Sequence, residues 1–260
     1  PPLNGRIEYD VAMISLLINS WKRPDNIYKI IESQKDYDLI REIIIFNNNK
    51  DITLSHHHSK VKIVNCNTDF GLRTRWANGL LASEDCLVFQ DDDLIAKPEA
   101  FSRLWQNFLN NPKRVYCAWG RSLDHQGRYN LKNCYGEVDI CLTCLASIPK
   151  ELIGFLVESE RLFFKANSLE YSAINKWGYH GNMNGEDIFL AYASLFAYNN
   201  KPMQVDLPVK HLPSSEALHK RSGHREARNN MVKKCEEFFF SNKTPQKKMR
   251  DFLQMVRNLK

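Results

Sequence analysis

The sequence predicts an α/β protein built on one mixed, mostly parallel sheet with helices on both sides. Segments of strand length and segments of helical periodicity alternate as β-α-β-β-α-β-α-β over roughly the first half of the chain. Some of the strand segments are continuous apolar runs, which is typical of strands covered on both faces. The length of 260 residues suits one large domain or two small ones. Because no long linker divides the chain, we expect a single domain over 1–260.

The first half contains the regular alternation. Pro24 and Asp25 mark the start of the first helix, because proline is favoured in the first helical turn. Ile27, Ile30 and Ile31 then fall on one face of that helix. We expect strands at 11–19, 40–49, 60–66, 86–90 and 114–120, and helices at 25–35, 71–82 and 97–110.

The pattern changes after about residue 130. Residues 136–148 form one long run of strand character, 148–160 and 185–200 are helical, and 203–208 is a short strand. The C-terminal segment predicts two amphipathic helices. Their apolar residues are Met231, Cys235, Phe238 and Phe239 in the first, and Met249, Phe252, Leu253, Val256 and Leu259 in the second.

Charge is distributed unevenly along the chain, whose formal net charge is +6. Residues 201–260 hold 14 Lys/Arg and 6 Asp/Glu, whereas the preceding residues are slightly acidic. A basic tail of this kind either binds an anion or forms the solvated face of a helix. No window approaches 18 consecutive apolar residues, so we expect no membrane segment in this chain.

Seven cysteines occur at irregular spacing. The odd number and the lack of a second CxxC pair favour buried reduced thiols over a disulfide framework or a metal site.

Three adjacent carboxylates, Asp91, Asp92 and Asp93, directly follow the apolar strand 86–90. Neighbouring carboxylates repel one another unless a cation neutralises them, and Mg²⁺ or Mn²⁺ typically uses one or two carboxylates together with substrate phosphates. In open α/β sheets, ligands bind at the carboxyl ends of the strands. The triplet therefore predicts a metal–diphosphate site, with a solvated acidic turn as the alternative. Arg23 and Asn47–Asn49 also follow strands, so we expect them along the same rim.

A second acidic pair, Glu186 and Asp187, opens the helix at 185–200 after a Gly/Asn-rich loop. Acidic residues in a first helical turn complement the helix dipole, which is a structural role. The same place also suits a catalytic carboxylate presented to a substrate. Trp119, Tyr129 and Tyr135 flank a loop and either stack on a sugar or pack in the core.

Taken together, the motifs resemble the C-terminal catalytic domain of the exostosin-like glycosyltransferases over roughly residues 9–240. The segments that carry the resemblance are, in chain order, INSWKRPDNIYKIIES, EIIIFNNN, LRTRW, LVFQDDDL, TCLASI, NGEDIFL and SGHREARNNMVKKC. WKR stands where the family usually has YNR, and FNN where it has WNN. These departures leave the donor sugar open.

The resemblance implies a GT-A fold, with a Rossmann-like nucleotide-binding half at about 9–125 and an acceptor-binding and catalytic half at about 126–260. It also implies a UDP-sugar donor, an oligosaccharide or glycoprotein glycan acceptor, Mn²⁺ (or Mg²⁺) as cofactor, and transfer with retention of configuration. Matched position by position, Arg23, Asn48, Arg73, Arg75, Asp91 and Asp92 bind the nucleotide sugar, Asp93 binds the metal, and Asp187 and Arg228 are catalytic. The family usually works in the Golgi lumen behind an anchor; a chain complete as it stands would instead be cytoplasmic.

Two other functions remain open at this stage. DxD phosphatases and phosphotransferases also carry aspartates after an apolar strand, but usually on the first strand, whereas here they follow about the fourth. A nucleic-acid-binding domain would use the basic tail, but the chain has no recognisable module of that kind, and the triplet would repel phosphates without a metal. We therefore expect glycosyl transfer and no nucleic-acid partner.

Overall fold

The computed structural model describes residues 13–130, 134–167, 185–214, 223–241 and 243–258. These residues contain an eight-stranded mixed sheet. Its strands β3, β2, β1 and β4 are mutually parallel, and β10 joins β4 antiparallel. In spatial order the strands are β3 (Val61–Asn65), β2 (Ile40–Asn47), β1 (Ile14–Ser20), β4 (Cys86–Asp91), β10 (Leu145–Pro149), β6 (Tyr116–Cys117), β11 (Met203–Gln204) and β8 (Gly136–Glu137). The predicted mixed, mostly parallel sheet is confirmed.

Two pairs of short strands lie beside the main sheet. β5 (Leu94–Ala96) pairs with β12 (Val209–His211), and β7 (Gly120–Arg121) pairs with β9 (Ile140–Cys141), both antiparallel. The first pair follows directly on the acidic triplet, and the second lies in the region predicted as one long strand.

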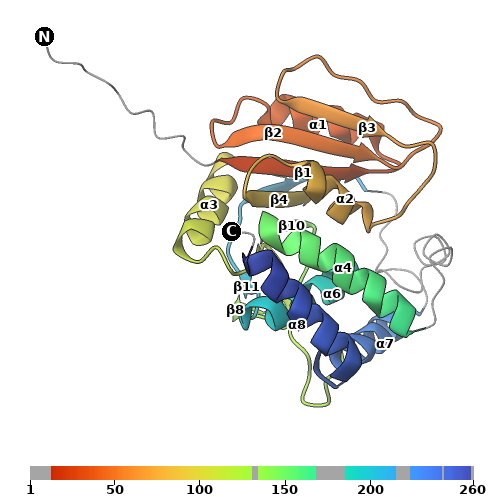
Figure 1. The fold of residues 1–260 in the computed structure, drawn as a ribbon. Helices are drawn as coiled ribbons and strands as arrows, with labels where there is room; N and C mark the ends of the chain where they lie inside the picture. The colour runs from red at the N-terminus through yellow and green to blue at the C-terminus, as the bar shows by residue number, and fades with distance from the viewer. Residues whose placement is uncertain (1–12, 131–133, 168–184, 215–222, 242, 259–260) are drawn as a thin grey trace, which may run out of the picture.

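Helices cover both faces of the sheet (Figure 1). One face packs against α1 (Pro24–Gln34) and α3 (Pro98–Asn110). The opposite face packs against the other helices, and Figure 1 shows α4, α6, α7 and α8 gathered together there. These helices are α2 (Thr74–Leu81), α4 (Lys150–Ala166), α6 (Glu186–Tyr198), α7 (His224–Glu236), the π-helical turn η2 (Glu237–Ser241) and α8 (Lys243–Asn258).

The apolar run of β1 explains this three-layer arrangement. Ile14, Leu16 and Ile18 are buried in the core under α1 and α3, whereas Leu17 is buried in the core on the opposite face. Side chains alternate across a strand, so a strand with apolar residues on both faces is stable only when both faces are covered.

The run at 136–148 is not the single strand that its composition predicts. It divides into β8, β9 and β10, because its backbone groups bond to different parts of the chain. The Val138 amide donates to the Pro202 carbonyl, and the Leu142 amide donates to the Trp119 carbonyl. Gly136 also adopts a positive φ of 77°, a conformation that interrupts an extended strand. The predicted strand at 114–120 is divided in the same way between β6 and β7.

The two C-terminal helices are confirmed, and they complete the core on the α6 side. The Phe238 ring lies 5.3 Å from the Phe163 ring, and the Phe239 ring lies 5.2 Å from the Phe189 ring. Val256 and Leu259 were predicted to extend the apolar face of α8, but their side chains lie outside the described part of the molecule. All seven cysteines are free thiols, and four of them are buried. In the described ranges, no helix combines the length and apolar character needed to cross a membrane.

The order of the strands positions the functional residues. The chain adds β2 and β3 on one side of β1 and then returns to place β4 on the other side. The carboxyl ends of β1 and β4 consequently lie side by side, with Asn19 opposite Asp91. Such a point of reversal is where open α/β sheets bind ligands.

Candidate functional site

The acidic triplet lies at the carboxyl end of β4, an interior strand. Asp91 is the last residue of the strand, and Asp92 and Asp93 form the turn into β5. The side chains of Asp91 and Asp93 are 33% and 29% exposed, whereas that of Asp92 is only 8% exposed. Two open carboxylates therefore flank a buried one, at the edge of the sheet where the sequence predicted them.

Arg23 binds this triplet from the start of α1. One guanidinium nitrogen, Nη1, makes a short ion pair with Asp92 Oδ1 and lies 3.5 Å from Asp93 Oδ2. The other, Nη2, donates to Ser214 Oγ at 2.7 Å. Burial raises the pKa of Asp92 to about 6, against the opposing effect of Arg23 and with a further contribution from Asp91.

Arg75 pairs with Asp91 from α2. Its Nη2 forms a short ion pair with Asp91 Oδ1, and its Nη1 donates to the Thr143 carbonyl at 3.3 Å. Burial opposes the charged form of this arginine, but the Asp91 and Glu186 carboxylates outweigh it and raise its pKa. Arg75 is therefore a permanent buried cation between the end of β4 and the start of α6.

Glu186, the first residue of α6, is linked to Arg75 through Thr143. Thr143 Oγ1 donates to Glu186 Oε1 at 3.2 Å, and burial raises the pKa of Glu186, with Asp187 adding to the shift. Asp187 Oδ1 accepts the amide of Ile188 at 2.8 Å. Asp91 of the triplet and Glu186 of the acidic pair, almost a hundred residues apart in sequence, thus interact with one buried arginine.

Arg228 of α7 completes this group. Its Nη2 donates to Asp187 Oδ2 at 2.6 Å, and both side chains are buried. The guanidinium carbon lies 4.3 Å from the ring centroid of Tyr129, which is cation–π distance. Burial opposes the charge of Arg228, but Asp187 outweighs it and raises the pKa of the arginine. Arg228, which belongs to the basic C-terminal segment, therefore contacts the Asp187 carboxylate at the start of α6.

Asn48 follows β2 and holds the loop before α2. Its Nδ2 donates to Thr74 Oγ1 at 2.9 Å and to the Gly71 carbonyl at 3.4 Å, and its Oδ1 accepts the Phe70 amide at 3.3 Å. Asn19 at the end of β1 donates to the same Thr74 hydroxyl at 2.8 Å. Asn48 thus joins the ends of β1 and β2 to α2, on the rim predicted from the sequence.

Arg73 lies apart from these carboxylates, toward α4. It forms a short ion pair with Glu160, and its guanidinium carbon lies 4.6 Å from the Phe164 ring centroid. The Trp76 indole also donates to Glu160 at 3.4 Å. The two arginines of the LRTRW segment therefore point to different partners, because they are two positions apart on a helix.

Several residues at the site were not identified from the sequence. Thr143 links Arg75 to Glu186, Ser214 binds Arg23, and Asn26 Nδ2 donates to the Asp92 carbonyl at 3.0 Å. Thr143 and Asn26 lie within the segments TCLASI and INSWKRPDNIYKIIES but were given no role, and Ser214 lies outside the quoted segments. The only sequence signal for Asn26 is its position three residues after Arg23 at the start of a helix.

The three aromatic residues weighed as a sugar platform have different surroundings. Tyr129 is buried against Arg228, and the Trp119 ring lies 5.8 Å from the ring of His211. Tyr135 is 83% exposed. Among the three, Tyr129 alone is buried, Trp119 is half-buried, and Tyr135 is open to solvent.

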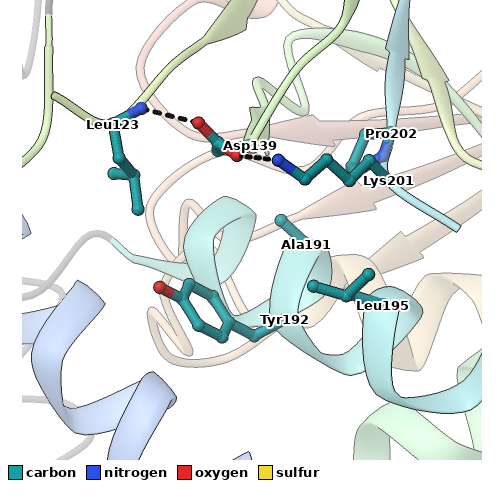
Figure 2. A pocket seen from close by; sticks show the side chains of 7 residues that line it. All are labelled: Leu123, Asp139, Ala191, Tyr192, Leu195, Lys201 and Pro202. Atoms are coloured by element: carbon teal, nitrogen blue, oxygen red, sulfur yellow. Dashed lines mark hydrogen bonds and ion pairs between the residues drawn. The ribbon is translucent and has the colours of Figure 1, made fainter. Parts of the chain in front are cut away.

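A small cavity lies along α6, beginning one turn after Asp187 (Figure 2). Asp139 lines the cavity and accepts hydrogen bonds from the Leu123 amide at 2.8 Å and from Lys201 Nζ at 2.7 Å. The cavity volume is about 60 Å³, well below the roughly 300–1,000 Å³ of small-molecule sites. The cavity has room for a few water molecules. Its lining residues are Leu123, Asp139, Ala191, Tyr192, Leu195, Lys201 and Pro202.

Comparison with known proteins identifies the family. The model for glycosyl transferase family 2 matches residues 15–166, more than half of the chain, including β1, β4 and the acidic triplet. The chain belongs to glycosyltransferase family 2. Asp187 and Arg228 lie beyond the matched range. No curated protein sequence matches this glycosyltransferase significantly.

Solved structures support the same fold. A crystal structure of GalNAc-T7 with UDP, GalNAc and Mn²⁺ matches with a TM-score of 0.60 at 12% sequence identity. The match covers 95% of this glycosyltransferase and 55% of the GalNAc-T7 chain, so the chain spans little more than half of that protein. The predicted GT-A fold is confirmed. The closer resemblance to exostosin-like enzymes stays a prediction.

Proposed function

We propose that this family 2 glycosyltransferase is metal-dependent and transfers a sugar from a UDP-sugar donor to an oligosaccharide or glycoprotein glycan with retention of configuration, as the exostosin-like resemblance implies. The observation that carries the proposal is the meeting of two carboxylate groups around Arg75. Asp91 of the triplet pairs with Arg75 from β4, and Glu186, which accepts from Thr143 at the start of α6, also raises the pKa of Arg75. A nucleotide sugar needs a cation site for its diphosphate and a carboxylate near its sugar, and this arrangement offers both.

The triplet fits a hard divalent cation. Its donors are carboxylate oxygens, which Mn²⁺ and Mg²⁺ prefer, and the side chains of Asp91 and Asp93 are partly open. In the described part of the chain, no three His, Cys, Asp or Glu side chains are arranged to hold an ion by themselves. This arrangement of side chains favours a metal site whose remaining ligands are diphosphate oxygens and water. Asp93 would hold the metal, whose chemistry is to act as a Lewis acid on the departing diphosphate.

Asp91 and Asp92, together with four residues around them, would bind the nucleotide sugar. Arg23 adjoins Asp92, Arg75 adjoins Asp91, and Asn48 lies where β2 ends beside α2. Arg73, which pairs with Glu160, would have to leave that partner to reach the nucleotide. We place these residues in a nucleotide-binding half at about 9–125.

Asp187 and Arg228 would be the catalytic residues in an acceptor-binding half at about 126–260. During transfer the sugar gains oxocarbenium-like charge, and the Asp187 carboxylate would stabilise that charge or form a short-lived covalent bond to the sugar. Arg228 would contribute hydrogen bonds to the diphosphate as negative charge develops on it. The acceptor would approach on the leaving-group side and give its proton to a phosphate oxygen of the diphosphate, so that no separate base is required.

A donor screen tests the proposal. The purified protein is incubated with a panel of UDP-sugars, including GlcNAc, GalNAc and xylose donors, and released UDP is measured with Mn²⁺, with Mg²⁺ and with EDTA. We expect hydrolysis of at least one donor that depends on the divalent cation. Release that continues unchanged in EDTA would contradict metal dependence, and hydrolysis of simple phosphate esters instead would favour a DxD phosphatase.

A further inference from the structure

Arg23 lies where a cation is required at the acidic triplet. Its Nη1 contacts Asp92 and lies 3.5 Å from Asp93, so one guanidinium nitrogen spans two of the three carboxylates. Asp91 has its own cation in Arg75. Three adjacent carboxylates are thereby neutralised largely by two arginines of the same chain.

The chain fixes Arg23 in this position from several sides. Arg23 is the N-cap residue of α1, immediately after β1, which lies beside β4. Its Nη2 donates to Ser214, so the same guanidinium also holds the segment that follows β12. Asn26 reinforces the contact by donating to the carbonyls of Asp92 and Pro213, at 3.0 and 3.1 Å. The Leu212 amide also donates to the Asp93 carbonyl at 2.7 Å.

We propose that Arg23 competes with the metal: it occupies the cation position at Asp92 and Asp93 when no metal is bound, and a divalent ion must displace it. The inference rests on the proposed metal site. It gives Arg23 a role that the resemblance does not, since the resemblance places this arginine at the nucleotide.

Electrostatics supports competition over joint occupancy. A guanidinium and a divalent ion carry the same sign, and both would need the oxygens of the same two carboxylates. Neighbouring charges of like sign cost free energy, most of all where burial lowers the effective dielectric constant. Because Arg23 also binds Ser214, its displacement by metal would remove one bond between the start of α1 and the segment after β12, and the bond from Asn26 to the Pro213 carbonyl would remain.

The test measures Mn²⁺ binding directly and without turnover, first without nucleotide and then with saturating UDP. Free Mn²⁺ is followed by electron paramagnetic resonance during titration of wild type and Arg23→Gln at neutral pH. We expect Arg23→Gln to bind Mn²⁺ more tightly, on the order of tenfold, because it removes a neighbouring positive charge. Arg103→Gln is the matched control. It removes an equal charge from α3, where Arg103 pairs with Asp206, and should leave Mn²⁺ affinity unchanged.

A second variant protects the test against misfolding. Ser214→Ala keeps the charge of Arg23 and removes only one of its restraints, so we expect a smaller gain in Mn²⁺ affinity and an unchanged fold by circular dichroism. If neither Arg23→Gln nor Ser214→Ala binds Mn²⁺ more tightly than wild type, while Mn²⁺ and UDP still bind together, Arg23 does not compete and the proposed function stands. If no protein binds Mn²⁺ with or without UDP, both proposals are wrong.

Discussion

Arg228 on α7 donates a hydrogen bond to Asp187 on α6, with 2.6 Å between Nη2 and Oδ2, and both side chains are buried. The contact joins the basic C-terminal segment to the acidic start of α6 across a separation of 41 residues. Because each charge is the principal partner of the other, a change at either position affects stability as well as any chemistry at the site.

The first prediction concerns this buried pair. Arg228→Ala leaves the Asp187 carboxylate buried without its cation, and removing one member of a buried pair costs about 3–5 kcal/mol. We therefore expect a clearly lower midpoint of urea unfolding, measured by circular dichroism. Arg103→Ala, which breaks an exposed pair with Asp206, is the control and should cost about 0–1 kcal/mol. Equal effects of the two changes would mean that the buried pair adds no special stability.

The second prediction concerns Asp93. Asp93→Ala should abolish metal-dependent transfer and leave the midpoint of unfolding close to that of wild type, since it removes one of three mutually repelling carboxylates. In wild type, EDTA should strongly reduce the affinity for UDP measured by isothermal titration calorimetry. Asp36→Ala, at an exposed position beyond the end of α1, should change neither property. UDP affinity that is equal with and without EDTA would argue against a metal at Asp93.

The third prediction concerns Glu42 on β2, a buried carboxylate remote from the triplet. Burial alone would raise its pKa, but Lys62, Ser15 and Ser83 donate hydrogen bonds that together lower it from 4.5 to about 2. A carboxylate whose pKa is lowered by folding stabilises the protein above its unfolded-state pKa. This contribution should be complete above about pH 4.5 and be lost as the pH falls toward 2.

Glu42→Gln should therefore lower the free energy of unfolding at pH 7 by about 1.5–3 kcal/mol, the usual contribution of a hydrogen bond to a charged group. The difference from wild type should shrink between about pH 4.5 and 2, as measured by urea unfolding at several pH values. Glu99→Gln, on the exposed side of α3, serves as the control. A difference that stays constant over this range would mean that the charge of Glu42 contributes nothing.

The sequence predicted the features that depend on local pattern. Continuous apolar runs located β1 and β4, and the alternation of elements placed Asp91–Asp93 at the carboxyl edge of a parallel sheet. Sequence reasoning failed where long-range backbone partners decide the structure. The run at 136–148 has strand character throughout, yet bonds from Val138 to Pro202 and from Leu142 to Trp119 divide it. Pro202 and Trp119 lie outside the run, so the pattern of residues within it could not predict these bonds.

Side-chain pairing was also beyond the sequence. Arg73 and Arg75 form one motif, but helix geometry sends Arg73 to Glu160 and Arg75 to Asp91. Arg23 was expected at a nucleotide, and without a ligand its nearest anions are Asp92 and Asp93. In each case the type of residue indicated an anion partner, and only the folded chain determined which anion it is.

The last prediction concerns Asp187 and the stereochemistry of transfer. Asp187→Asn removes the anion of the buried pair, but it keeps a side-chain oxygen that can accept from Arg228 or from the Ile188 amide, so it should cost less stability than Arg228→Ala and the fold should persist. It removes the negative charge that would matter most when the sugar becomes oxocarbenium-like. We expect near-normal binding of the UDP-sugar and a kcat lower by on the order of 10²–10³-fold. The matched change Glu186→Gln, at the neighbouring carboxylate, should slow transfer less.

Proton NMR of the anomeric coupling in the product gives the direct test of the stereochemistry: an α-linked product from an α-linked donor indicates retention. A β-linked product would mean inversion, and Asp187 or Glu186 would then have to act as the base that activates the acceptor hydroxyl.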